Sequence, residues 1–143
     1  MHMISPGKCL VLYGKAWFER DARKRLEVLR ECCTEDIVFA DNEGRFEGLQ
    51  EVSDMIGRSM DQMAGDDPVD TESATTDRGR VAGRVSVEVV TELETLHGFF
   101  RYGFVWIVGG ERHPGGTDFG EFAPDGRMRL ITVWNSTDDF PVR

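Results

Sequence analysis

The sequence predicts an α+β domain in which helices pack on one face of an antiparallel sheet. Apolar residues recur at helical spacing in most of the chain before Gly65. After Arg84 they instead alternate with polar residues, or run together, between turn sequences such as GG and PDG. Helices followed by a run of strands are typical of this class. At 143 residues the chain suits one core, so we expect a single domain spanning 1–143.

The N-terminal part predicts three helical segments. Ser5 can cap the first free amides and Pro6 is tolerated at the first helical position. Asp21 is a second plausible cap, so we expect two consecutive helices or one bent helix. Their apolar positions are Cys9, Leu12, Tyr13, Ala16 and Trp17, then Ala22, Leu26, Leu29 and Cys33. A third helix is expected between Gly48 and Gly65, and its apolar stripe is Val52, Met55, Ile56, Met60 and Met63.

The remaining segments predict strands and turns. CTEDIVFAD (33–41) has the alternation of a short strand and runs into the turn sequence DNEG. Four later segments are strand-like: RVSVEVVTEL, HGFFRYGFVWIVGG, GGTDFGEF and RMRLITVWNS. Residues 65–83 show no clear pattern, so a loop, a short hairpin and an edge strand all stay open.

Residues 97–108 are apolar on both faces of the expected strand. One face carries Gly98, Phe100, Tyr102, Phe104, Trp106 and Val108, and the other carries Phe99, Arg101, Gly103, Val105 and Ile107. One face must line the core or a pocket. An apolar sheet face left in water would be unusual, so the other face favours a homodimer. Arg101 could form a cross-strand ion pair with Glu88 or Glu121, or bind a substrate carboxylate.

Composition excludes several functions. The net charge of -9 opposes binding to nucleic acid or to an anionic membrane, and we interpret the basic run ARKR (22–25) as a solvated helix face. No apolar run approaches the roughly 20 residues of a membrane span, and MHMISPGK does not resemble a secretory signal. We expect a cytoplasmic protein whose three cysteines, Cys9, Cys32 and Cys33, are reduced core residues. No metal or cofactor motif is present, so we expect no metal and no cofactor.

Several short sequence segments occur in the order known from one protein family: YGKAW, CTEDIVFAD with its glycine turn and helix, FVW, GTDF and DGRM. Through these segments the chain resembles the nuclear transport factor 2-like superfamily, in its SnoaL-like and ketosteroid-isomerase-like branch. The resemblance implies a cone-shaped α+β barrel, with N-terminal helices in the concave face of a strongly curved antiparallel sheet. It also implies an apolar pocket, homodimers formed through the outer sheet face, and proton transfer on small apolar carbonyl compounds without a cofactor.

The resemblance also implies catalytic residues. Asp118 stands where these enzymes carry a cavity acid, Asp41 where isomerases carry their general base, and Tyr13 corresponds loosely to an oxyanion tyrosine. An aspartate in an apolar cavity loses hydration of its charged form, so it can hold a proton near neutral pH. Asp41 could equally be a turn residue that caps its own backbone, and Asp118 could face outward. Gly120, on the same face as Asp118, would leave room for a ligand.

A wider set of residues is expected to line the pocket. These residues are Trp17, Phe39, Met55, Met60, His97, Phe100, Tyr102, Trp106, Phe122 and Trp134. The tryptophans and methionines could also be plain core, and His97 could be a surface residue. The expected function is that of an isomerase, a cyclase or a dehydratase-type lyase that binds a small hydrophobic carbonyl compound, with Asp118 as acid/base. The alternative is a non-catalytic module for small-molecule binding or dimerisation.

Overall fold

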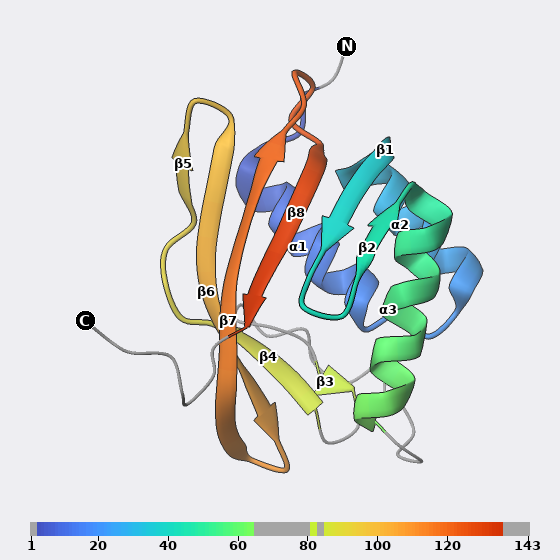
Figure 1. The fold of residues 1–143 in the computed structure, drawn as a ribbon, viewed down its shortest axis with the longest axis vertical. Coiled ribbons are helices and arrows are strands. Elements are labelled where there is room, and N and C mark those ends of the chain that lie inside the picture. Colours follow the sequence, from blue (N-terminus) through green and yellow to red (C-terminus); the bar gives the residue numbers. More distant parts are fainter. Residues whose placement is uncertain (1–2, 65–80, 83–84, 136–143) are drawn as a thin grey trace.

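The structure is a computed structural model that describes residues 3–64, 81–82 and 85–135. The N-terminal part holds helices α1 (Pro6–Trp17) and α2 (Ala22–Cys32), strands β1 (Cys33–Ala40) and β2 (Arg45–Glu47), and helix α3 (Leu49–Ala64). Strands β3 (Val81–Ala82), β4 (Val85–Val89), β5 (Glu94–Leu96), β6 (Phe99–Val108), β7 (Glu111–Phe122) and β8 (Met128–Asn135) follow (Figure 1). This order confirms the predicted α+β class.

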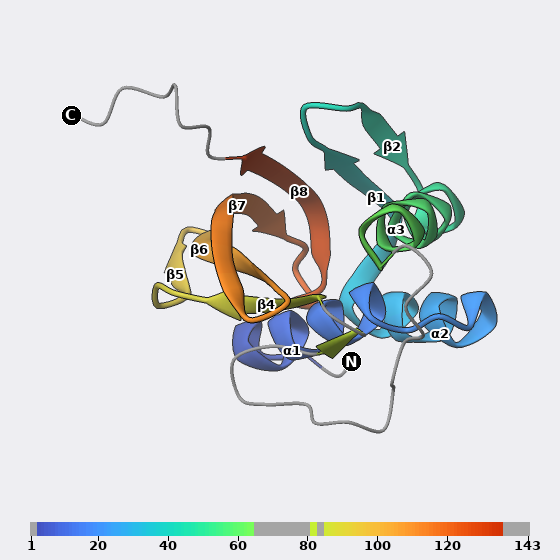
Figure 2. The same ribbon diagram turned by 90° about the horizontal axis from the view of Figure 1, so that it is seen from below.

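The strands form one eight-stranded sheet with the order β2-β1-β8-β7-β6-β4-β3, and β5 pairs with the end of β6. Every pairing is antiparallel except that of β1 with β8. Within the described residues the sheet is curved but open, with β2 and β3 at its edges (Figure 2). The expected curved sheet is therefore confirmed, but it is mixed, and it does not close into the barrel that the resemblance implied.

The helix boundaries follow the predicted caps. The Ser5 side chain accepts from the amide of Lys8 at 3.3 Å, and the Asp21 side chain accepts from the amides of Arg23 and Lys24 at 2.9 and 3.2 Å. Each cap satisfies backbone donors that have no partner within the helix. The N-terminal segment is therefore two separate helices rather than one bent helix. No helix in the described part of the chain is long and apolar enough to cross a membrane.

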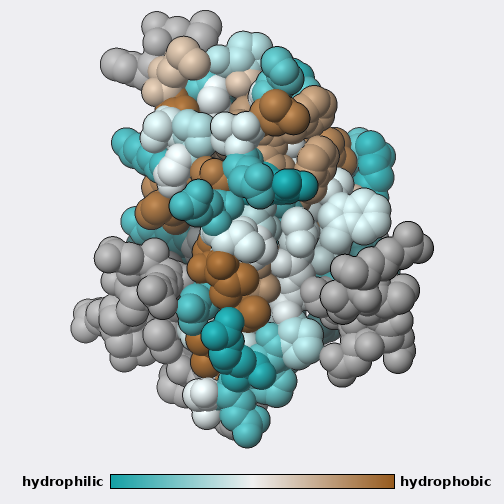
Figure 3. Space-filling model, turned by 90° about the vertical axis from the view of Figure 1, so that its left-hand side faces the viewer, coloured by the Kyte–Doolittle hydropathy of each residue, from teal (hydrophilic) through white to brown (hydrophobic). Residues whose placement is uncertain are grey.

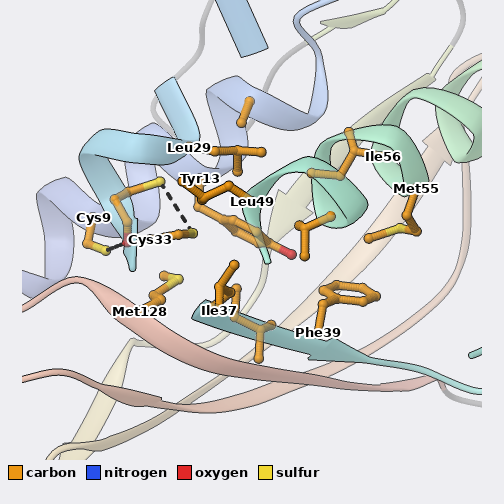
Figure 4. Packing of buried hydrophobic residues seen from close by; sticks show 14 of the residues in the cluster. Cys9, Tyr13, Leu29, Cys33, Ile37, Phe39, Leu49, Met55, Ile56 and Met128 are labelled. Atoms are coloured by element: carbon orange, nitrogen blue, oxygen red, sulfur yellow. Dashed lines mark hydrogen bonds between the residues drawn. The ribbon is translucent and has the colours of Figure 1, made fainter. Parts of the chain in front are cut away.

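The three helices and the inner face of the sheet share one core (Figure 4). Its fully buried larger side chains include Leu29, Ile37, Phe39, Val52, Ile56, Met60, Phe100, Met128 and Ile131. Cys9, Cys32 and Cys33 are free and buried in this core, as predicted. The side chain of Met63 lies outside the described residues.

β6 has the two faces that its alternation predicted. Phe100, Tyr102 and Phe104 are buried against the core, whereas Phe99 and Arg101 are exposed on the outer face. Arg101 forms a cross-strand ion pair, as one of the two alternatives expected, but neither Glu88 nor Glu121 is its partner. Because β5 pairs with β6, Arg101 lies opposite Glu94 and donates to both of its carboxylate oxygens, at 3.1 and 3.2 Å. Glu121 pairs instead with Arg129 on β8.

The interpretation of the basic run ARKR (22–25) as a solvated helix face is wrong for Arg25. Its side chain is only 6% exposed and donates to the carbonyl oxygens of Glu19 at 3.0 Å, Arg20 at 3.3 Å and Ser53 at 3.0 Å. Gly57 makes this possible, because a Cβ there would lie 2.8 Å from the guanidinium Nη1. Arg25 therefore ties α2 to the α1–α2 loop and to α3.

We predict that Arg25→Met lowers the free energy of unfolding by about 1–3 kcal/mol, because it leaves three backbone carbonyls without their donor. The matched control is Arg23→Met, which changes an exposed residue of the same helix and should stay within about 0.5 kcal/mol of the parent. Urea denaturation followed by circular dichroism measures both. Equal stabilities for the two variants would contradict this role of Arg25.

Candidate functional site

A one-residue irregularity in β7 determines which way its acidic residue faces. Near the β6–β7 turn Trp106 lies opposite His113, whereas further along Phe104 lies opposite Gly116. Moving two residues along β6, from 106 to 104, therefore corresponds to moving three residues along β7, from 113 to 116. β7 thus contains one extra residue, a β-bulge, at 114–115. Such a bulge moves all the following side chains to the other face.

The bulge brings Asp118 to the inner face. Continued without the extra residue, the register near the turn would set Asp118 opposite the exposed Arg101. The observed register sets it opposite the buried Tyr102 on β6, and opposite Val133 on β8. Gly115 suits the bulge, because a Cβ there would lie 2.0 Å from the carbonyl oxygen of Phe104. Asp118 is accordingly 6% exposed.

The two carboxyl oxygens of Asp118 have different surroundings. The Tyr102 hydroxyl donates a hydrogen bond to Oδ2. Oδ1 is buried, and no hydrogen-bond partner for it exists among the described residues. A buried polar atom without a partner costs free energy, and such atoms are rare in stable cores unless they have a function. Of the three such side-chain atoms in the described part of the chain, Oδ1 is the one that belongs to a titratable group.

Burial raises the pKa of Asp118 to about 7, and the hydrogen bond from Tyr102 opposes part of that rise. The charged form loses hydration in the apolar core, whereas the tyrosine hydroxyl stabilises it. At neutral pH both protonation states are consequently populated. An acid with this pKa can release and take up a proton near pH 7, which is what a general acid/base does.

Tyr13, on α1, is the second hydroxyl of the site. Its ring is 4% exposed and lies in the middle of the core cluster, with its hydroxyl pointing away from the buried cysteines (Figure 4). Burial, and after it the nearby charge of Asp118, raise the pKa of Tyr13 well above its ordinary value. The same two causes raise the pKa of Tyr102. Both tyrosines therefore stay protonated and can serve as hydrogen-bond donors.

Aromatic rings surround this group. Phe100 stacks on Tyr102 with ring centroids 6.4 Å apart and contacts Phe122 at 4.6 Å. Gly120 was expected to leave room for a ligand, but the space beside it holds the Phe100 ring, whose Cζ would lie 2.5 Å from an added Cβ. The missing side chain of Gly120 on β7 thus lets the Phe100 ring of β6 and the Leu130 backbone of β8 pack closely against it.

Several predicted pocket residues lie in the same core. On the helical side, the Trp17 ring contacts Tyr13 at 6.4 Å and Phe39 at 6.3 Å, measured between centroids. The other members that pack in or against this core are Met55, Met60, Phe100, Tyr102, Trp106 and Phe122. The structure thus brings these side chains together with Asp118 and Tyr13 in one cluster.

Three predicted site residues are not brought to this cluster. The Asp41 carboxylate accepts from the amides of Glu43 and Gly44 at 2.9 and 3.0 Å, so it caps the β1–β2 turn. His97 is exposed in the turn between β5 and β6, with φ of 50°. Trp134 is 68% exposed, because its position on β8 points to the outer face.

The sequence did not reveal that Tyr102 would be a partner of Asp118. Both residues were singled out, but pairing them requires the register of β6 against β7, and the bulge displaces that register by one residue. The signal available was the PGG sequence at 114–116, since proline and glycine within a strand often mark a bulge.

Comparison with solved structures identifies the fold. A protein described as a candidate isomerase of the SnoaL-like family, from Agrobacterium tumefaciens, aligns with a TM-score of 0.71 at 18% identity, over 90% of this chain and 95% of that chain. A candidate SnoaL-like polyketide cyclase from Jannaschia sp. aligns at 0.58 and 11% identity, over 89% and 81%. An NTF2-like protein of unknown function from Cytophaga hutchinsonii aligns at 0.57 and 8% identity, over 95% and 94%.

The chain therefore has the nuclear transport factor 2-like fold that SnoaL-like proteins share, and the resemblance found in the sequence is confirmed at that level. Identities this low show the fold and not the activity, because one fold carries many functions. No family model matches the sequence, and no curated protein matches it. In the described residues no group of three or more His, Cys, Asp or Glu side chains could hold a metal ion.

The raised pKa of Asp118 predicts a pH dependence of stability. Between the ordinary aspartate pKa and about 7, the folded protein holds a proton that the unfolded chain has released, so stability falls as pH rises through this window. We expect Asp118→Asn to remove this component, so that its stability relative to the parent improves from pH 4 to pH 7 by on the order of a few kcal/mol. Urea denaturation at several pH values measures it. Parallel pH profiles for parent and variant would rule out a raised pKa.

Proposed function

We propose that the protein binds a small, largely apolar carbonyl compound and catalyses proton transfer on it, with Asp118 as acid/base. The observation that carries this proposal is the buried Oδ1 of Asp118, which lacks a partner among the described residues, on an acid whose pKa is about 7. The aromatic and aliphatic side chains around it suit an apolar ligand. The isomerase and cyclase descriptions of two structural neighbours are compatible with this chemistry.

The residues suggest the following steps. The carboxylate form of Asp118 takes a proton from the carbon next to the substrate carbonyl, and the C–H electron pair moves into the enolate. The Tyr13 hydroxyl donates a hydrogen bond to the developing oxyanion, which stabilises the transition state in an apolar site. The protonated Asp118 then returns the proton to the same or another carbon, which gives exchange or isomerisation. Asp41 has no assigned step, and its catalytic role stays a prediction.

Deuterium exchange tests the proposal without knowledge of the natural substrate. We expect the protein to accelerate exchange of the α-protons of cyclohexenone and α-tetralone in D2O, followed by proton NMR. Asp118→Asn should slow the catalysed exchange by about 10²- to 10⁴-fold, because the acid/base is lost. Asp36→Asn, which changes an exposed residue on β1, is the matched control. It should catalyse exchange of the α-protons of these ketones at the rate of the parent.

Equal exchange by Asp118→Asn and the parent would remove Asp118 from the mechanism. Binding of the ketones by the parent without any acceleration of exchange would favour the non-catalytic alternative, in which the acid only orients a ligand.

We also propose that two copies associate through the outer sheet face. Leu96, Phe99, Phe119 and Trp134 on this face are 69%, 41%, 39% and 68% exposed, and Phe99 stacks on Phe119 with centroids 5.8 Å apart. Apolar groups interrupted by polar ones cover the side of the molecule on which β5 and β6 lie (Figure 3). A second copy with the same surface would bury these rings isologously.

We predict that the parent sediments as a dimer and that Phe119→Glu sediments as a monomer, because the charge would be buried in the interface without a partner. Val11→Glu is the matched control, since Val11 is an apolar residue on α1 that is 64% exposed and lies away from the outer sheet face. Sedimentation velocity measures all three proteins. A monomeric parent, or a Phe119→Glu variant that stays dimeric, would contradict this interface.

A further inference from the structure

We propose that Tyr102 is a positioning residue that keeps the proton of Asp118 on Oδ1 and so determines which carboxyl oxygen meets the substrate. This inference deepens the proposed function and rests on it, since it concerns the acid assigned there. It assigns to Tyr102 a contact with the acid in place of the contact with substrate expected from the sequence.

The geometry fixes the donor. Tyr102 and Asp118 are directly opposite each other on β6 and β7, so both side chains stand on the inner face at close range. The Tyr102 hydroxyl reaches Oδ2, and its ring is held by the Phe100 ring, which lies nearly parallel to it at 12°. Phe100 is itself confined, because it packs over Gly120 and against Phe122. The Tyr102 ring therefore lies in this packed aromatic cluster, with its hydroxyl at Oδ2.

This contact makes the two oxygens chemically unequal. The Tyr102 hydroxyl stays protonated, and Oδ2 is the acceptor it has among the described residues, so donation to Oδ2 is what satisfies its hydrogen. When Asp118 takes up a proton, Oδ2 therefore remains the carbonyl-type oxygen and Oδ1 carries the hydrogen. Oδ1 is also the oxygen without a partner among the described residues. The acid thus carries its proton, or its free lone pair, on the one carboxyl oxygen that has no partner among the described residues.

Among the groups around Asp118, Tyr102 is the one that changes the pKa of its carboxyl group. From α1, Tyr13 interacts with the charge of the carboxyl, and from β6, Tyr102 is hydrogen-bonded to it. The neighbour on β8 is the apolar Val133. Beyond burial, Tyr102 is the cause that acts on the pKa of Asp118, and it lowers that pKa.

Two spectroscopic measurements on the free protein test the inference. In the Tyr102→Phe variant the pKa of Asp118 should rise by about one to two units, because a hydrogen bond to the charged form is lost. Carboxyl carbon NMR of protein labelled at aspartate measures it, with Asp118→Asn to assign the signal. Tyr13→Phe is the matched control and should cause a smaller shift, since no hydrogen bond from Tyr13 to Asp118 exists in the structure.

Infrared difference spectra locate the proton. At a pH below 7 the carbonyl stretch of protonated Asp118 should move to higher wavenumber in Tyr102→Phe, because Oδ2 then no longer accepts a hydrogen bond. If the proton sat on Oδ2 instead, the carbonyl oxygen would be Oδ1, and the band would not rise. An unchanged band, or a pKa that stays or falls in Tyr102→Phe, overturns the inference.

A second variant covers the case in which Tyr102→Phe does not fold. Site-specific 3-fluorotyrosine at position 102 keeps the ring and makes the hydroxyl a stronger donor, so the pKa of Asp118 should fall, and a rise would overturn the inference. None of these measurements uses turnover. Loss of the proposed catalysis with the expected titration would therefore refute the activity alone, and the opposite pattern would refute the role of Tyr102 alone.

Discussion

The site depends on one extra residue in β7. Without the bulge at 114–115, the pairing that starts at the β6–β7 turn would carry Asp118 to the outer face beside Arg101, where it would be an ordinary surface carboxylate. With the bulge, the acid turns inward and meets Tyr102. A single insertion reverses every side chain beyond it because the strand period is two. The inward direction of Asp118 thus originates in a backbone irregularity, and the glycine at 115 accommodates it.

Two opposing effects then set the properties of the acid. Burial disfavours the charge, whereas the tyrosine hydroxyl stabilises it, and their balance leaves the pKa of Asp118 at about 7. A carboxyl group without the hydrogen bond would stay protonated at neutral pH, and one exposed to water would stay ionised. The apolar core therefore determines the pKa of this acid as well as contributing to stability, because it excludes the water that would otherwise hydrate the charge.

The helices bring the other half of the site. Tyr13 lies close enough to the acid to interact with its charge because α1 packs on the inner face of the sheet. Helix α2 is held against its neighbours by Arg25, whose guanidinium donates to three backbone carbonyls. Arg25 looked like part of a solvated run because its neighbours Arg23 and Lys24 are charged and exposed. Gly57 on α3 opens the space that it fills, and the residues are 32 positions apart, so no local pattern could connect them.

The sequence by itself determined the class of fold, the helix starts at Ser5 and Asp21 and the two faces of β6, because these depend on caps and periodicities within a few neighbouring residues. It also singled out Asp118, through the family resemblance. The tertiary structure alone decided that Asp118 meets Tyr102, that the Asp41 carboxylate accepts hydrogen bonds from its own turn and that Trp134 points outward. Those outcomes depend on strand register and on contacts between distant segments, which local spacing does not encode.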